Sequence, residues 1–131
     1  MNHSIGSIIQ ITFNRSNEGS IHFGQVVEAL LGAGVESYWV DYRACRTTYY
    51  LPNGQTYSLD MAAPQAGIAR TFSAPDIQAA IRAAQQGEVL YPEFKRRSQA
   101  AGCIGYMVWL QGRHVSYYGR NGEAHIERFP D

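Results

Sequence analysis

The sequence has little cysteine, no excess charge of either sign and no long apolar run, and each of these absences excludes a class of protein. Two cysteines in 131 residues are too few for a disulfide scaffold. Lys and Arg together number 11, as do Asp and Glu, so the chain lacks the basic excess of a nucleic-acid-binding protein. No run approaches the roughly 18 consecutive apolar residues that mark a membrane span. We therefore expect no nucleic-acid partner and no membrane span.

Motifs for metal binding or catalysis are also absent. The sequence contains no C-x-x-C, H-E-x-x-H or phosphate-loop pattern, and its histidines and cysteines lack the spacing of a zinc site. In the strand pairing argued below, Cys103 would lie on the order of 20 Å from His114 and 12 Å from His125, beyond hydrogen-bond reach. We expect no metal and no cofactor, and we favour a non-catalytic protein. The N-terminal segment has no basic stretch before a long apolar run, which favours a cytoplasmic location.

The most informative feature that is present is an internal repeat. When the chain is shifted by 68 residues, Gly34-Val35-Glu36-Ser37-Tyr38-Trp39-Val40 falls on Gly102-Cys103-Ile104-Gly105-Tyr106-Met107-Val108 without a gap. In the same alignment Asn53-Gly54 falls on Asn121-Gly122. A shared register over this length indicates duplication of one structural unit. It predicts a single domain of two repeats, about 4–63 and 72–131, joined by a linker at 61–72.

Each half of the sequence predicts two helices followed by three strands. In the first half, apolar residues recur at helical spacing up to Gly19, and Ser20 is the expected N-cap of a second helix. In the second half, Ser73 precedes Asp76 by three residues and opens a helix, and Pro92 stands near the start of the next one. Alternating apolar and polar residues follow in both halves. We expect an α+β fold whose helices pack on one face of an antiparallel sheet.

Two turns predict the strand register in the second half. A turn at Gln111-Gly112 pairs Val108 with Val115, and a two-residue turn at Asn121-Gly122 pairs Tyr118 with His125. These registers place a nearly all-apolar set on the face toward the helices: Ile104, Tyr106, Val108, Leu110, Val115, Tyr117, Ala124 and Ile126. The same alternation in the first half directs a second set toward the helices: Tyr38, Val40, Tyr42 and Tyr49.

The opposite face of the expected sheet is unusually aromatic and is therefore the expected place of function. An exposed apolar patch commonly marks an interface or a ligand site. Three interpretations stay open: a covering layer such as the other half or a second subunit, a protein-binding surface, and a small-molecule site. The candidate residues of this face are Trp39, Tyr50, Tyr57, Trp109, His114, Tyr118, His125 and Glu127.

Two segments carry a resemblance to a known family. The pattern Ala-Gly-Val-Glu-Ser-Tyr-x-Val-Asp at 33–41, followed by Thr-Tyr-Tyr at 48–50, resembles the YbcV-like proteins of bacteria and prophages. The segment Tyr117-Tyr118-Gly119-Arg120-Asn121-Gly122-Glu123 is similar to the strand-turn signature of the same proteins. These proteins are of unknown function and are often labelled phage envelope protein. The resemblance implies a non-enzymatic protein of phage or mobile-element origin and implies no ligand.

Two functional hypotheses follow. The first is a non-catalytic accessory or interaction protein that forms a homodimer or binds a protein partner through the aromatic sheet face. The second is a small-ligand-binding protein or enzyme with a pocket between the two repeats, built from Tyr50, Tyr57, Tyr118, His125 and Glu127. A flat face buried by another chain favours the first hypothesis, whereas a concave and water-accessible cluster of these side chains favours the second.

Overall fold

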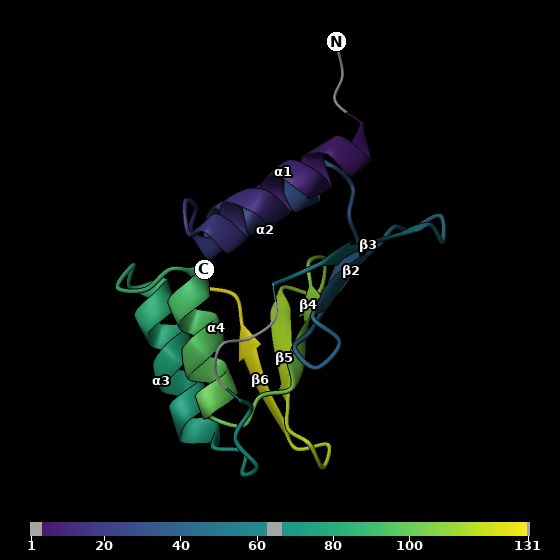
Figure 1. Ribbon diagram of the computed structural model, residues 1–131. Coiled ribbons are helices and arrows are strands. Elements are labelled where there is room, and N and C mark those ends of the chain that lie inside the picture. The colour runs from purple at the N-terminus through teal and green to yellow at the C-terminus, as the bar shows by residue number, and fades with distance from the viewer. Residues whose placement is uncertain (1–3, 63–66, 131) are drawn as a thin grey trace.

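The computed structural model describes residues 4–62 and 67–130, which form four helices and six strands (Figure 1). The first unit comprises α1 (Ile5–Glu18), α2 (Phe23–Gly32), β1 (Ser37–Asp41), β2 (Arg46–Tyr50) and β3 (Thr56–Asp60). The second unit comprises α3 (Ala74–Gln85), α4 (Tyr91–Ala100), β4 (Gly105–Trp109), β5 (His114–Tyr118) and β6 (Ala124–Arg128). The α+β fold class is confirmed. Within the described part of the chain, no helix has the length and apolar character needed to cross a membrane.

The two units keep the 68-residue offset closely. The helix α4 and all three strands of the second unit begin and end 68 residues after their counterparts, and only α3 is one residue shorter at each end than α1. The offset also relates the described residues with left-handed backbone, which are Gly19 and Gly87, Gly34 and Gly102, Cys45 and Arg113, and Gly54 and Gly122. We propose on this basis one domain of two repeats with the predicted bounds. The predicted linker at 61–72 includes residues 63–66, which lie outside the described residues.

One antiparallel sheet joins both units, with the strand order β3-β2-β1-β4-β5-β6. At its centre β1 pairs with β4 so that Trp39 lies opposite Met107, the residue 68 positions later in the sequence. Because counterparts pair with each other, an approximate two-fold axis relates the units at this seam. Gly105 makes the close approach possible, since a Cβ atom there would lie 2.4 Å from the carbonyl oxygen of Val40.

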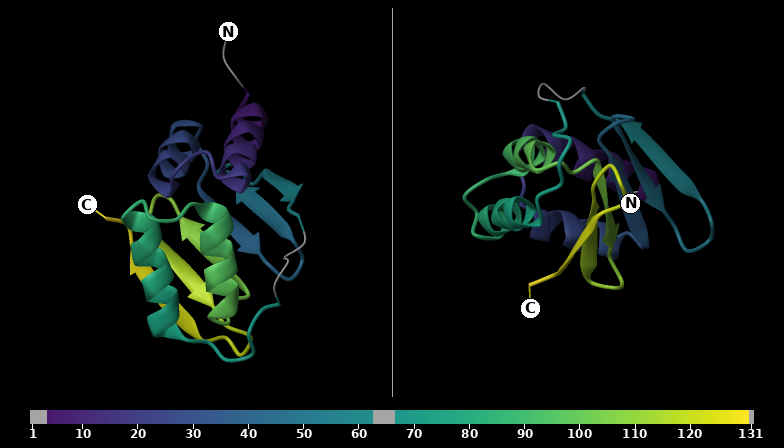
Figure 2. Two further views of the ribbon diagram at one scale, coloured as in Figure 1. Left: turned by 60° about the vertical axis from the view of Figure 1, so that its left-hand side comes forward. Right: turned by 90° about the horizontal axis from the view of Figure 1, so that it is seen from below.

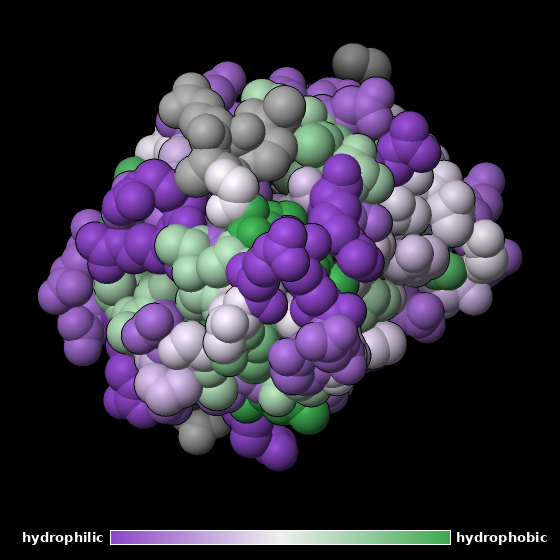
Figure 3. Space-filling model, turned by 60° about the horizontal axis from the view of Figure 1, so that its bottom comes forward, coloured by the Kyte–Doolittle hydropathy of each residue, from purple (hydrophilic) through white to green (hydrophobic). Residues whose placement is uncertain are grey.

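The helices pack together on one side of the sheet (Figure 2). Their apolar faces and the facing side chains of the central strands form a single buried core, which includes Leu30, Ile77, Val108 and Leu110. Figure 3 shows apolar side chains in small patches between polar ones on the underside of the molecule.

Helix starts are correct in one unit and wrong in the other. Ser73 caps α3 as predicted, because its hydroxyl accepts a hydrogen bond from the backbone N–H of Asp76. The prediction of Ser20 as the N-cap of α2 is wrong. The hydroxyl of Ser20 donates instead to the carbonyl of Arg15, and His22 occupies the N-cap position, where its backbone N–H donates to the side chain of Gln25.

Of the two strand registers predicted for the second unit, one is correct and one is wrong. The pairing of Val108 with Val115 is confirmed. The pairing of Tyr118 with His125 is wrong by one residue, because Tyr118 pairs with Ala124. The backbone N–H of Gly119 donates to the carbonyl of Glu123, which closes a three-residue loop with Gly122 in left-handed geometry at φ 81°. An Asn-Gly pair is compatible with this loop as well as with a two-residue turn.

This one-residue difference reverses the faces of the two edge strands. His125 lies opposite Tyr117 and therefore faces the helices, as does Glu127, whereas Ala124 and Ile126 face away from them. In the first unit Tyr57 lies opposite Tyr49 and also faces the helices. The assignment of Tyr57, His125 and Glu127 to the open sheet face is therefore wrong, as is the assignment of Ala124 and Ile126 to the core face.

The corrected faces predict the effect of two truncations on stability. Val108 is fully buried, so Val108→Ala should lower the free energy of unfolding by about 1–3 kcal/mol through lost burial and a residual cavity. Ile126 is 61% exposed, so Ile126→Ala should change it by less than about 0.5 kcal/mol. Urea denaturation of both variants measures the difference. If Ile126→Ala lowered the free energy of unfolding as much as Val108→Ala, the result would favour the predicted pairing of Tyr118 with His125 over the observed one.

Candidate functional site

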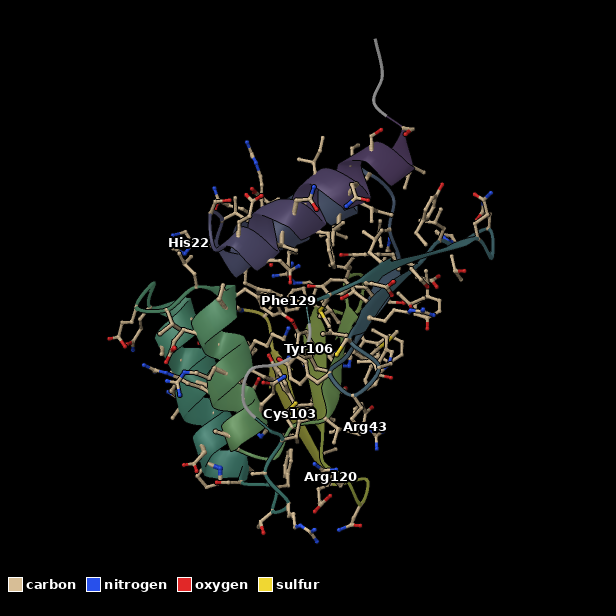
Figure 4. The ribbon with its side chains drawn as sticks, in the orientation of Figure 1. His22, Arg43, Cys103, Tyr106, Arg120 and Phe129 are labelled. Carbon is tan, nitrogen blue, oxygen red and sulfur yellow. The ribbon has the colours of Figure 1, made fainter. Side chains whose placement is uncertain are left out.

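A cavity of about 470 Å³ lies between the helices and the sheet, close to the seam between the two units. Its walls come from the start of α2, the end of α3, the α3–α4 connection, α4, the central strands and the C-terminal end of β6. Figure 4 shows His22 near one end of α2, Phe129 close by and Tyr106 farther in toward the sheet. A volume of this size is within the range of pockets that hold small organic molecules.

Aromatic side chains form the inner wall of the cavity. Tyr106 and Tyr117 stand on adjacent strands with ring centroids 5.3 Å apart. Phe94 of α4 packs edge-on against Tyr106 at 6.2 Å and contacts Tyr117 at 6.1 Å. Tyr38 of β1 completes this wall from the first unit. Both units therefore contribute aromatic rings to one concave surface.

A second aromatic pair forms part of the rim. The rings of Phe23, the first residue of α2, and Phe129, just after β6, meet edge to face with centroids 5.7 Å apart. The guanidinium of Arg113 lies 5.6 Å from the centre of the Phe129 ring, a cation–π contact that also holds this ring. The rim thus joins the first helix pair to the C-terminal segment of the chain.

Glu127 is the one carboxylate among the described residues that line the cavity. Its Oε1 atom lies 3.2 Å from Nε2 of His125, and both side chains are largely buried, with 23% and 18% of their surface exposed. The His125 ring also packs against Tyr117, at 6.4 Å between centroids. A carboxylate held in this way against an aromatic wall supplies a localised negative charge in a mostly apolar space.

The internal two-fold relation places a second position of the same kind in the molecule. This second position lies between α1, α2, β2 and the start of α4. Most of the residues that line it stand 68 positions before or after a residue that lines the large cavity. Its volume is only about 30 Å³, which is enough for about one water molecule. Of these two equivalent positions, one is therefore open and the other is filled by side chains.

Three differences between counterparts explain why one position is closed. Phe13 stands in the closed position where the smaller Ile81 stands in the open one. Met61 turns inward where Phe129 is at the rim, and its sulfur lies 3.4 Å from the hydroxyl of Thr47. Tyr91 reaches inward to 3.9 Å from the same sulfur, whereas its counterpart in the open position is the exposed Phe23.

The structure divides the predicted site residues among three places. Glu127 lines the cavity, and His125 contacts Glu127. Tyr57 packs over Gly6 of α1, where a Cβ atom would lie 3.2 Å from the Tyr57 ring. The other predicted residues are together on the helix-free face of the sheet, where Trp39 contacts Tyr118 and Trp109 contacts His114: Trp39, Tyr50, Trp109, His114 and Tyr118.

Sequence reasoning missed most of the cavity wall. The residues it missed as site residues are His22, Phe23, Tyr38, Ile81, Tyr91, Phe94, Tyr106, Tyr117 and Phe129. A signal for the difference was present in the repeat, because Phe13 aligns with Ile81, Leu59 with Glu127, and Met61 with Phe129. Comparison of the unlike counterparts would have singled out these positions.

Cys103 does not belong to a reactive arrangement. Burial raises the pKa of the Cys103 thiol to about 11, and this thiol donates to the carbonyl of Gly105 at 3.3 Å. A buried thiol with a raised pKa is a weak nucleophile at neutral pH. In the described ranges, no group of three or more His, Cys, Asp or Glu side chains is placed to hold a metal ion.

The buried tyrosines around the cavity have raised pKa values. Burial raises the pKa of Tyr91 to about 12, although the neighbouring hydroxyls of Tyr106 and Tyr42 partly offset the effect. Burial likewise raises the pKa of Tyr38, Tyr106 and Tyr117. The folded protein therefore keeps these phenols protonated at pH values where the unfolded chain ionises them.

The raised pKa values predict alkaline destabilisation. Below pH 10 the phenols are protonated in both states, so their contribution to stability is fully present. As the pH rises from 10 toward 12, the unfolded chain loses protons that the folded protein retains, and the free energy of unfolding should fall. Urea denaturation across this range measures the fall. Ultraviolet titration of the folded protein would contradict the prediction if all its tyrosines ionised together near pH 10.

Comparisons with known proteins place the chain among uncharacterised relatives. Residues 43–127 match a protein family described as a protein of unknown function, DUF1398. The uncharacterised proteins Mb2035 of Mycobacterium bovis and Rv2012 of Mycobacterium tuberculosis are each 29% identical to the chain over 112 residues. The match covers 82% of this chain and 66% of each relative, so the chain spans about two thirds of the length of these relatives.

Proposed function

The chain belongs to the DUF1398 family of proteins of unknown function, and from the geometry of its large cavity we propose that it binds a small organic molecule between its two units. The single observation that carries the proposal is the asymmetry of the two equivalent positions, about 470 Å³ against about 30 Å³. The closed position demonstrates that this fold can fill such a space with its own side chains.

Packing energetics support the proposal. Protein interiors are close-packed, and each large unfilled space forfeits contacts and burial that stabilise the fold. Small substitutions are sufficient to fill the space, since Phe13 and Met61 do so in the first unit. The cavity is lined mostly by apolar and aromatic side chains with a few polar groups, which is typical of binding sites for small molecules.

Filling the cavity provides the test. Ile81→Phe introduces the ring that occupies the counterpart position at Phe13, and it should weaken binding of N-phenylnaphthylamine, a neutral fluorescent probe of apolar cavities. We expect a loss of affinity of about tenfold or more, which corresponds to about 1.4 kcal/mol or more. The probe's fluorescence titration measures the affinity.

The matched control is Ile11→Phe, the same substitution at a residue that is 48% exposed on α1. It should leave the affinity for the probe unchanged. Ala84→Leu, at another lining residue of α3, serves as a second filling variant if Ile81→Phe does not fold. The proposal would be contradicted if the unmodified protein did not bind the probe, or if neither filling variant weakened the binding.

A second candidate function is association through the helix-free face of the sheet. Trp109 and Ile126 are 38% and 61% exposed there, and exposed apolar residues of this size favour an interface. The accessory role and the homodimer that the sequence predicts would both use this face. The YbcV-like resemblance, the phage-envelope role and the cytoplasmic location stay predictions. A symmetric dimer requires only one self-complementary patch.

Light scattering at micromolar concentration tests this candidate. We expect the unmodified chain to have the mass of a dimer and the double variant Trp109→Ser, Ile126→Ser to have the mass of a monomer, because the variant removes the exposed apolar side chains. Ile11→Ser, on the helical side of the molecule, is the control and should keep the dimer. An unmodified chain that is monomeric throughout this concentration range would exclude the homodimer.

A further inference from the structure

We propose, building on the proposed binding function, that the cavity selects an organic cation: an amine or quaternary ammonium group attached to an apolar or aromatic body. Glu127 would contact the cationic group, and the rings of Tyr106, Tyr117 and Phe94 would surround the body. The proposal names a class of ligand for the cavity and a specificity-determining residue within it.

The position of Glu127 is the first support. Glu127 pairs with Val115 and stands on the helix-facing side of β6, so its carboxylate and the phenol of Tyr117 are diagonal neighbours on one face of the sheet. Its counterpart in the closed position is Leu59, which is apolar. A negative charge is therefore present in the open position and absent from the closed one, where no ligand has room.

The aromatic wall is the second support. Electron-rich ring faces attract cations, and the attraction is strongest where water is excluded. Tyr106, Tyr117 and Phe94 are in mutual contact and buried, and Tyr38 extends the same surface. A carboxylate beside several aromatic rings is an arrangement that favours an ammonium group over a neutral group of the same shape.

Four basic residues lie at or near the cavity: His22, Arg128, His125, and Arg113, whose guanidinium contacts the Phe129 ring at the rim. Arg128 is among the residues that line the cavity, but it alternates with Glu127 along β6, so its exposed side chain is directed toward the helix-free face. His22 is exposed at the N-cap of α2, near the rim. His125 is the basic group in contact with Glu127, at 3.2 Å, and it holds the carboxylate in position against the wall.

A matched set of three probes tests the charge preference. The cation is naphthylmethyl-trimethylammonium, its neutral carbon isostere is neopentylnaphthalene, and its anionic analogue is naphthylacetate. We expect calorimetry on the full chain to give an affinity for the cation about tenfold higher than for the neutral isostere, within the range of a desolvated cation–π contact plus a carboxylate. Naphthylacetate should bind more weakly than either.

Two substitutions assign the preference to Glu127. Glu127→Gln keeps the size of the side chain and removes its charge, so it should lower the affinity for the cation about tenfold and leave that for neopentylnaphthalene unchanged. Glu88→Gln makes the same change of charge at an exposed residue of the α3–α4 connection outside the cavity lining, and should alter neither affinity. Urea denaturation of both variants verifies that they are folded.

The outcomes separate this inference from the proposed function. Three results would overturn the cation preference: equal affinities for the cation and its isostere, tighter binding of naphthylacetate, or an equal effect of Glu127→Gln on the cation and its isostere. The proposed function would then still stand, provided that Ile81→Phe weakens N-phenylnaphthylamine binding. Loss of charge discrimination in Glu127→Gln, with discrimination retained in Glu88→Gln, would establish Glu127 as the residue that selects the ligand.

Discussion

The pairing of β1 with β4 is the contact on which the rest of the structure depends. Without it, each unit would be a three-stranded sheet with an exposed strand edge beside two short helices, which is close to the lower limit of independent stability. With it, the strands form one six-stranded sheet and the four helices pack together on one side. The pairing also brings Tyr38 and Tyr106 to either side of the seam, where both line the cavity.

The two positions related by the internal two-fold axis share a backbone and differ in their side chains. In the closed position, Phe13 and Met61 of the first unit and Tyr91 of α4 fill the space, and this position contributes to packing. In the open position, Ile81 is smaller than Phe13, and the aromatic pair of Phe23 and Phe129 stays at the rim. The same fold thus contains both a packed position and an open position.

Much of the fold was predictable because it rests on local patterns. The repeat offset, the order of elements, the cap of α3 at Ser73 and the β4–β5 register follow from short-range sequence features. The β5–β6 register was not predictable from Asn121-Gly122 alone, since two loop lengths fit that pair. The one-residue difference moved His125 and Glu127 to the helix side. The cavity itself depends on the β1–β4 pairing and on how α2, α3 and α4 meet, and these contacts are long-range in sequence.

The two-fold relation lies within one chain, and this has a consequence for how the protein can change. In a symmetric assembly of two identical chains, every substitution occurs twice, so opening one position would open both and the loss of packing would be doubled. Here Leu59 and Glu127 are encoded separately, as are Phe13 and Ile81. One half of the molecule is therefore free to lose side-chain volume and acquire charge while the other half maintains the shared core.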